Sequence, residues 1–257
     1  MFRIQIVSVF VSIMLATPAA AMIDLGSAKS FAVLAGSTVT SAGATVITGS
    51  LGVSPGTATV PPAVIMLGAL HAGDPLAAAA HADLGTAFAA VVAAPGAVDL
   101  TGQDLGGLVL TPGVYRFATS AQLTGTLYLD ARGDPGANFL FQIGSTLTTA
   151  SDSAVDLLGG GQAGHVFYAV GSSATLGTGT HFAGSLLAQA SITLNDGARV
   201  DGRVLARDAA VTLVRNIVTV PTDAGAVPEP AQWMFFVGGF GIVGLGLRRR
   251  RSPLPFA

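Results

Sequence analysis

Apolar and polar residues alternate through the second half of the chain, and the alternation recurs with a period of 18 residues. Residues 171–188 align with residues 189–206 without a gap, so polar and apolar positions of one segment fall on those of the next. Because strand side chains point alternately to the two faces of a sheet, this alternation indicates short β-strands. Each repeat holds three strand-like pieces separated by Gly, Asn or Asp, which predicts one coil of a three-sided β-solenoid.

Earlier segments of the chain fit the same template. Residues 31–40 and 139–148 each match the junction between two sides of a coil, and about six coils result in total. A long insertion separates the first coil from the others. We therefore predict a mainly β, discontinuous solenoid within residues 22–226.

The insertion contains a predicted helix at about residues 75–94. Asp74 is a favourable N-cap residue, and Pro75 suits the first helical position. The apolar residues that recur on one helical face are Leu76, Ala80, Leu84, Phe88 and Val91. A helix of this length spans ~30 Å, close to the height of six coils stacked ~4.8 Å apart. We therefore expect the helix to lie along the solenoid and to cover one side.

Two of the three predicted sides differ in polarity. Four strand segments are apolar at consecutive positions, so they must be buried on both faces and are assigned to the side under the helix. These segments are 139–141, 166–168, 186–188 and 204–206. A second side carries charged residues beside its inward apolar positions and is predicted to be an ordinary solvated surface. Its charged residues are Asp156, His181, Arg199 and Asp201.

The third predicted side carries Ser and Thr where charged residues would be expected. Its candidate binding residues are Thr146, Thr148, Ser173, Thr175, Ser191, Thr193 and Thr212, joined by Thr38, Thr40 and Thr124. Ala210 interrupts the pattern, as does Gln122, which is paired with Thr124. Repeated small, β-branched side chains make a flat, stiff surface, and the absence of charge favours a flat, repetitive ligand. Stacked threonines also stabilise a sheet without a ligand, so a purely structural ladder is the alternative.

Composition argues against several classes of function. The chain has 257 residues, 51% of them hydrophobic and 10% charged, and no cysteine, so it can bury a large core without disulfides. Residues 22–226 contain thirteen Asp, seven Lys or Arg and no Glu; an acidic domain without a basic cluster is not expected to bind nucleic acid. The four His lie in separate segments, and we predict no metal, cofactor or catalytic residue. A polysaccharide-cleaving enzyme using Asp156 and Asp201 is a weaker alternative.

Both ends of the chain differ from the predicted domain. Residues 1–21 contain one cation, an apolar run and three consecutive alanines, which predicts an export signal cleaved after Ala21, with an N-terminal membrane anchor as the alternative. At the other end, a Pro-Glu-Pro motif precedes an uncharged stretch over 233–247 and a basic cluster. These residues are Pro228, Glu229 and Pro230, followed by Arg248, Arg249, Arg250 and Arg251.

This order of motif, short apolar helix and basic cluster in residues 227–257 resembles the PEP-CTERM sorting tail. The resemblance implies that the tail anchors the protein transiently in the membrane and that an exosortase-type enzyme processes it. It also implies that the protein reaches the cell surface or the extracellular matrix. A permanent C-terminal anchor is the alternative reading of the same residues.

The domain itself resembles the large microbial ice-binding protein family over nearly all of residues 24–219. The phrases that carry the resemblance include LGSAKSFAVLAGSTVTSAG, LTPGVYRF, FLFQIGSTLTTAS and GSSATLGTGTHFAGSLLAQASITLNDGARVDGRVLAR. The resemblance implies a discontinuous right-handed β-solenoid with a flanking helix, an ice crystal surface as partner and no catalysis. It assigns the binding role to the Ser and Thr positions given above. A structural or adhesive matrix protein on the same scaffold is the competing hypothesis, and a monomer is expected.

Overall fold

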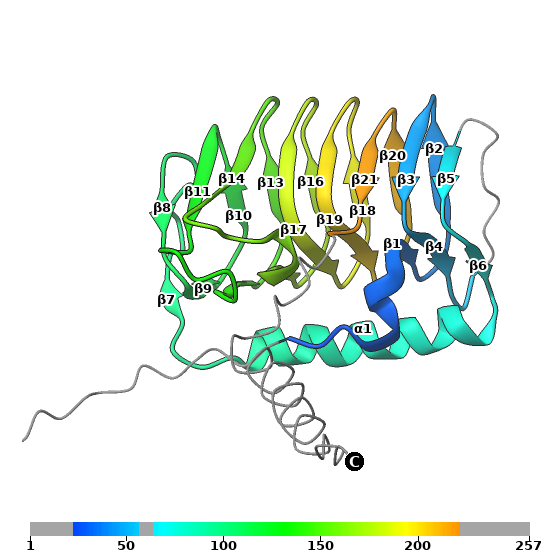
Figure 1. Ribbon diagram of the computed structural model, residues 1–257, viewed down its shortest axis with the longest axis horizontal. Helices are drawn as coiled ribbons and strands as arrows, with labels where there is room; N and C mark the ends of the chain where they lie inside the picture. Colours follow the sequence, from blue (N-terminus) through cyan, green and yellow to red (C-terminus); the bar gives the residue numbers. More distant parts are fainter. Residues whose placement is uncertain (1–22, 57–63, 222–257) are drawn as a thin grey trace, which may run out of the picture.

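A computed structural model describes residues 23–56 and 64–221, and within them the chain is mainly β (Figure 1). The described strands pair in parallel throughout and form three faces. The predicted export signal (1–21) and sorting tail (227–257) lie outside the described residues. The mainly β, parallel architecture predicted from the repeat is confirmed.

The first face lies under the helix and is named the helix-covered face. Its strands, in spatial order, are β7 (Val98–Asp99), β9 (Gly113–Phe117), β12 (Phe139–Ile143), β15 (Val166–Val170), the second halves of β17 (His181–Ala188) and β19 (Arg199–Ala206), then β1 (Phe31–Ala35), β4 (Ser50–Val53) and β6 (Leu70–Ala72). The four segments that the sequence assigned to this side all lie here, and their residues are buried.

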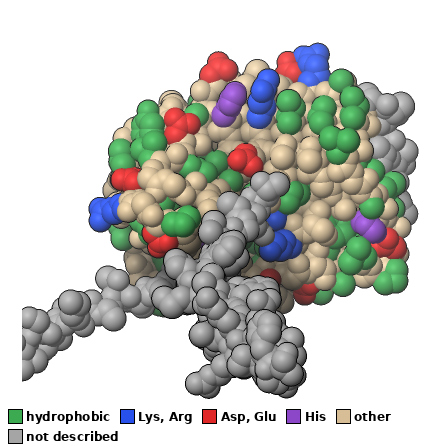
Figure 2. Space-filling model, viewed as in Figure 1, with side chains coloured by type: hydrophobic (Ala, Val, Ile, Leu, Met, Phe, Trp, Pro, Cys, Tyr) green, Lys and Arg blue, Asp and Glu red, His purple; other side chains and the backbone are tan. Residues whose placement is uncertain are grey.

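The second face exposes charged and apolar side chains together and is named the mixed face. Its strands are β8 (Val109–Leu110), β11 (Thr126–Asp130), β14 (Ala154–Leu158), the first halves of β17 and β19, then β21 (Ile217–Thr219), β3 (Thr45–Thr48) and β5 (Val64–Leu67). Asp156, His181, Arg199 and Asp201 are exposed on it, as predicted. Figure 2 shows Lys or Arg, Asp or Glu and His side chains dispersed among apolar ones, without a cluster of one charge.

The third face is a separate six-stranded sheet and is named the Ser/Thr face. Its strands, in spatial order, are β10 (Ala121–Leu123), β13 (Leu147–Thr149), β16 (Ala174–Leu176), β18 (Ile192–Leu194), β20 (Val211–Val214) and β2 (Val39–Ala42). The last neighbours in space, β20 and β2, come from opposite ends of the domain.

The N-terminal strands close the stack beyond the C-terminal ones. β1 pairs with β19 on one side and β4 on the other, while β2 pairs with β20 and β3 with β21. Strands adjacent in space are therefore separated in sequence by the insertion. The predicted discontinuity is confirmed by this pairing.

The insertion forms α1 (Pro75–Ala93), which runs along the length of the stacked strands (Figure 1). The Asp74 carboxylate accepts a hydrogen bond from the Ala77 backbone N–H at 2.8 Å, which caps the helix as expected. The helix is one residue shorter than predicted. A short 3-10 helix, η1 (Gly26–Ser30), lies next to it.

The buried side of α1 differs in part from the predicted one. Its buried residues are Ala77, Ala80, Leu84, Ala87 and Val91. Leu76 is 43% exposed, so its assignment to the buried side is wrong, and Phe88 is only half-buried. The helix sequence is apolar nearly all round, and small alanines let its axis approach the sheet more closely than leucine would. The short distance between α1 and the sheet therefore determines which residues of the helix are buried.

Two apolar clusters hold the molecule together. The larger fills the space between the three faces and contains a row of packed aromatic rings, Tyr115, Phe141, Tyr168 and Phe182, whose successive centroids are 5.5, 4.5 and 4.7 Å apart. The smaller lies between α1 and the outer surface of the helix-covered face. Burial on both sides explains why these strands are continuous apolar runs.

Candidate functional site

The Ser/Thr face presents a column of side chains at directly paired positions of its six strands. This threonine column consists of Gln122, Thr148, Thr175, Thr193, Thr212 and Thr40. All six residues are exposed or half-exposed, whereas the residues before and after each of the central four are buried. Because neighbouring strands of a parallel sheet lie ~4.8 Å apart, successive residues of the column are spaced at that interval.

A second column runs two residues earlier on the same strands. This serine column consists of Ser120, Thr146, Ser173, Ser191, Ala210 and Thr38. Apart from Ser120, their backbone carbonyls accept hydrogen bonds from the neighbouring strand, for example from Leu147 N to Ser173 O at 3.2 Å and from Ala174 N to Ser191 O at 3.0 Å. Side chains two residues apart on a strand point the same way, ~6.7 Å apart. The two columns therefore form a regular two-dimensional array.

The array is held from behind by the core. Ile192 and Leu194, which flank Thr193, are fully buried, and equivalent inward positions on the other strands are apolar. Threonine is also stiff about χ1 because it is β-branched. Backbone and side-chain positions are therefore both restricted before any ligand arrives.

Hydroxyl groups of the array differ in their hydrogen bonds. In the serine column, Thr146 donates to Ser120 at 2.9 Å, and the Ser173 and Ser191 hydroxyls lie 3.0 Å apart. In the threonine column, the central hydroxyls have no hydrogen-bond partner among the residues the structure describes; these belong to Thr148, Thr175 and Thr193. The central threonine column therefore offers its full hydrogen-bonding capacity to water.

The outward pair predicted for the segment around Gln122 differs from the one in the structure. Gln122 pairs with Thr148, so the outward pair on β10 is Ser120 and Gln122, and Thr124 lies two residues further along, outside both columns. The prediction of a sixth threonine at Thr124 is therefore wrong, and Ser120 was missed. A shift of two residues preserves the inward and outward alternation, so the apolar pattern could not detect it. The other nine predicted residues lie in the two columns.

A charged residue lies at one end of the array. Neither column contains a charged residue, but Asp104 forms a bridge with Gln122 at the edge of the sheet. Asp104 accepts hydrogen bonds from the Gly106 and Thr124 N–H groups at 2.6 and 2.9 Å. Partial burial would raise the pKa of Asp104, but these N–H groups outweigh it and lower that pKa. The ionised form of Asp104 is therefore favoured at this end of the array.

The described residues offer little support for other chemistry. Within residues 23–56 and 64–221, no group of three or more His or Asp is placed to hold a metal ion. Asp156 and Asp201 share the mixed face, but β17 lies between their strands, which separates them by two strand spacings, or roughly 9–10 Å. The residue of β17 that pairs with Asp201 is Ala183, which has no acidic or basic group.

Comparison with known proteins identifies the family. Residues 33–219 match the family model described as Ice-binding-like. The chain belongs to the ice-binding-like family. It is 51% identical over 235 residues to an ice-binding protein from Nostoc sp. (strain HG1), covering 88% of this chain and 86% of that one. It is also 30% identical to an ice-binding protein from Flavobacterium frigoris (strain PS1), over 78% of this chain and 77% of that one.

Solved structures of ice-binding proteins share the fold. A crystal structure of an ice-binding protein from an Antarctic biological consortium superposes with a TM-score of 0.79 at 44% identity, covering 84% of this chain and 99% of that chain. One from the Antarctic ascomycete Antarctomyces psychrotrophicus gives a TM-score of 0.76 at 41% identity, covering 79% of this chain and all of that one.

Proposed function

We propose that this protein adsorbs to ice through the Ser/Thr face. The observation that carries the proposal is the two-column array of hydroxyl and methyl groups, in register over six strands, uncharged and held rigid by the core. The names of its relatives in the ice-binding-like family support ice as the ligand.

The array suits a crystalline ligand for physical reasons. Hydroxyls hydrogen-bond to water, while methyl groups between them restrict where the nearest waters can lie. Because the spacing repeats in two directions, the bound waters adopt a repeating order that can merge with a growing ice surface. The adsorbed protein then blocks further growth at that position, which gives antifreeze activity and inhibits recrystallisation without any chemical reaction.

The test replaces central threonines with a larger side chain. Thr175→Tyr and Thr193→Tyr should each abolish uptake of fluorescently labelled protein by a slowly growing single ice crystal, because the ring lifts the surface off the ice. Thr86→Tyr is the matched control, since Thr86 is exposed on α1. Substitutions of side chains that point outward from the surface cost little stability, so all three variants should remain folded.

The outcome decides between ice adsorption and a structural role. Uptake of the parent and of the Thr86 variant, but not of the other two, supports the proposal. Unchanged uptake by all variants would refute the face assignment. No uptake of the folded parent would favour a structural or adhesive matrix protein on the same scaffold.

We further infer how the chain is organised and where it acts. The uniformly parallel pairing and six-stranded Ser/Thr face support a right-handed, three-sided solenoid of about six coils over residues 22–226. The residue pattern at the ends supports export through a cleaved signal (1–21) and transient anchoring by a tail (227–257) that an exosortase-type enzyme processes. The mature protein would then act, as a monomer, at the cell surface or outside the cell.

A further inference from the structure

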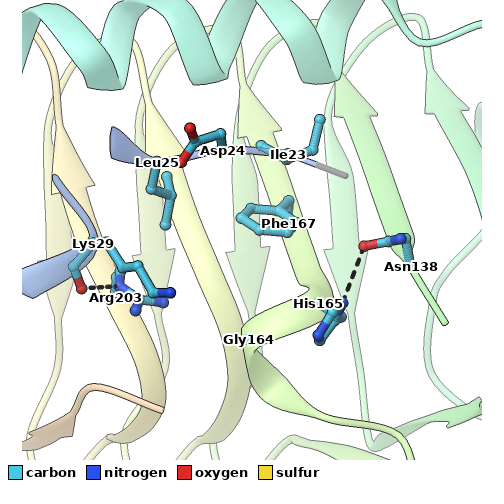
Figure 3. A pocket seen from close by; sticks show the side chains of 9 residues that line it. All are labelled: Ile23, Asp24, Leu25, Lys29, Asn138, Gly164, His165, Phe167 and Arg203. Carbon is cyan, nitrogen blue, oxygen red and sulfur yellow. Dashed lines mark hydrogen bonds between the residues drawn. The ribbon is translucent and has the colours of Figure 1, made fainter. Parts of the chain in front are cut away.

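α1 lies over the helix-covered face, and its two long sides differ in what packs beside them. On the side toward the mixed face, residues 23–30 lie against the helix; Figure 3 shows Ile23 and Leu25 next to it, and both are buried. Arg203, directly after the bend from the mixed face, donates from Nε to the Lys29 carbonyl at 2.9 Å. The N-terminal segment therefore covers this side of the helix.

The other side of α1 faces the corner where the chain turns from the helix-covered face to the Ser/Thr face. Residues three or four apart on a helix share one side, and this side carries His81, Gly85, Phe88 and Val92. His81 Nε2 hydrogen-bonds to the Arg207 carbonyl, and the Arg207 side chain lies beside Gly85. Phe88 is half-buried and Val92 is 50% exposed, so only the first half of this side is fully packed.

The residue directly after each strand of the helix-covered face accounts for this difference. After β17 and β19 it is Gln189 and Arg207, whose side chains are joined by a hydrogen bond of 3.4 Å. After β9, β12 and β15 it is Ala118, Gly144 and Gly171. An added Cβ at Gly144 would lie 2.4 Å from the Ala118 carbonyl oxygen, and one at Gly171 would lie 2.6 Å from the Gly144 carbonyl oxygen. The corner therefore holds almost no side chain opposite the second half of the helix.

A groove of about 440 Å³ results between the end of α1 and this corner. Phe88 and Val92 form its apolar wall, and Arg116 and Gln142, which pair in register, lie along it on the sheet. The groove crosses β9, β12 and β15, so it is about 10 Å long at ~4.8 Å per strand spacing. Small-molecule sites typically have volumes of roughly 300–1,000 Å³. The groove is therefore large enough for one small ligand.

The Gln142 amide holds the end of α1 and leaves no donor for a ligand. Its Nε2 donates to the Val91 and Ala94 carbonyls at 2.9 and 2.8 Å, so both amide hydrogens are used. Gln142 thereby fixes the apolar wall of the groove relative to the sheet. The charged side chain that lines the groove belongs to Arg116, and it supplies the N–H donors for a ligand.

Arg116 is exposed, and its guanidinium makes no hydrogen bond or ion pair with the residues that the structure describes. Asp99 lies beside it in register, but the Asp99 carboxylate accepts a hydrogen bond from the Thr101 N–H at 2.8 Å. Hydrogen bonds from Thr101 are the main cause of the lowered pKa of Asp99, and the charge of Arg116 contributes less. Asp99 does not line the groove, so the lining carries one positive charge and no negative one.

We propose that the groove binds a small amphipathic carboxylate, with its apolar part against Phe88 and Val92 and its carboxylate on the Arg116 guanidinium. The lining supports this class of ligand. An apolar wall favours an apolar body, a single cation favours an anion, and the planar guanidinium fork fits a carboxylate. Because Arg116 is exposed and Asp99 is adjacent, the charge pair should contribute modestly to affinity.

The bound ligand would stabilise the attachment of α1. It fills the unpacked half of the helix side, and a ligand that binds only the folded chain raises the free energy of unfolding by mass action. Ala118, Gly144 and Gly171 each precede a residue of the serine column by two positions. The groove therefore borders the Ser/Thr face without including it, and the proposal does not rest on ice adsorption.

The test measures binding of phenylbutyrate to the full chain. Equilibrium dialysis is carried out with the protein in nonionic detergent micelles, and uptake by micelles alone is subtracted. Phenylbutanol is the uncharged comparison ligand. Arg116→Gln removes the cation, and Arg199→Gln is the matched control, because Arg199 is exposed on the mixed face. Ala118→Leu places a larger side chain in the groove, and thermal unfolding checks that each variant is folded.

We expect saturable binding of one phenylbutyrate per chain. Arg116→Gln should weaken it about fivefold, the upper end for a solvent-exposed charge pair, while Arg199→Gln leaves it unchanged. Phenylbutanol should bind the parent about fivefold more weakly than phenylbutyrate and should be insensitive to Arg116→Gln. Folded Ala118→Leu should bind neither ligand.

Three results would overturn the proposal. They are no saturable binding of phenylbutyrate to the folded parent, equal affinity of the parent for phenylbutyrate and phenylbutanol, and equal losses in Arg116→Gln and Arg199→Gln. Ice uptake plays no part in this readout, so the groove and the Ser/Thr face can fail independently.

Discussion

The attachment of α1 depends on very few large side chains, which makes Leu84→Ala an informative perturbation. Three of the five buried positions of the helix are alanines, so Leu84 and Val91 supply most of its buried volume. Leu84 is 1% exposed and belongs to the cluster between α1 and the helix-covered face. Truncating a leucine at such a site costs about 2–5 kcal/mol of unfolding free energy. For a domain of this size, a loss of about 3 kcal/mol lowers Tm by roughly 6–12 °C.

Leu76→Ala is the matched control, because Leu76 lies on the same helix but is 43% exposed. It should change stability by less than about 0.5 kcal/mol. Thermal unfolding followed by circular dichroism measures both variants. Ice uptake, assayed in the cold where both are folded, should equal that of the parent, because α1 covers a different face from the array. Equal destabilisation by the two substitutions would refute the described helix packing, and lost uptake by folded Leu84→Ala would refute the independence of the two faces.

Three further predictions address the array, a corner and the pH response. Gln122→Thr should increase thermal hysteresis, because it completes the threonine column; a folded variant with unchanged or lower hysteresis would count against that column as the contact surface. Gly202→Ala should prevent folding or cost at least about 4 kcal/mol, because the new Cβ would lie 1.8 Å from the Gly184 carbonyl oxygen; a near-parental denaturation midpoint would contradict the corner geometry. Hydrogen bonds from the Ser27 backbone N–H and hydroxyl lower the pKa of Asp83. The ionised Asp83 carboxylate therefore stabilises the folded state above the unfolded-state pKa near 4, and this stabilisation is lost as pH falls through the folded-state pKa. Asp83→Asn should therefore be less stable than the parent at pH 7, with the difference shrinking in acid; a difference independent of pH would argue against this linkage.

Regular repeats made much of the molecule predictable. Where the turn lengths of successive coils match, one alignment determines which residues pair, and Ser173 lies beside Ser191 and Thr175 beside Thr193 as the 18-residue period predicts. The two-sided burial of 186–188 and the solvated character of Arg199 also follow from local polarity, because each strand residue has only two directions in which to point. These features depend on sequence-local chemistry.

Tertiary structure decided those features for which the local sequence pattern fits more than one arrangement equally well. Thr124 and Gln122 differ by a shift of two residues that leaves every apolar residue inward, so only the backbone pairing with Thr148 shows which one belongs to the column. On α1, Leu76 and Ala77 both suit an apolar side, and the close approach of helix and sheet selected the alanine. The pairing of β1 with β19 is a contact between residues about 170 positions apart that no local pattern encodes. The chain's own sequence thus determined its strands and their polarity, while long-range packing determined which strands are neighbours, because pairing partners are selected by contacts that exist only after the stack has closed.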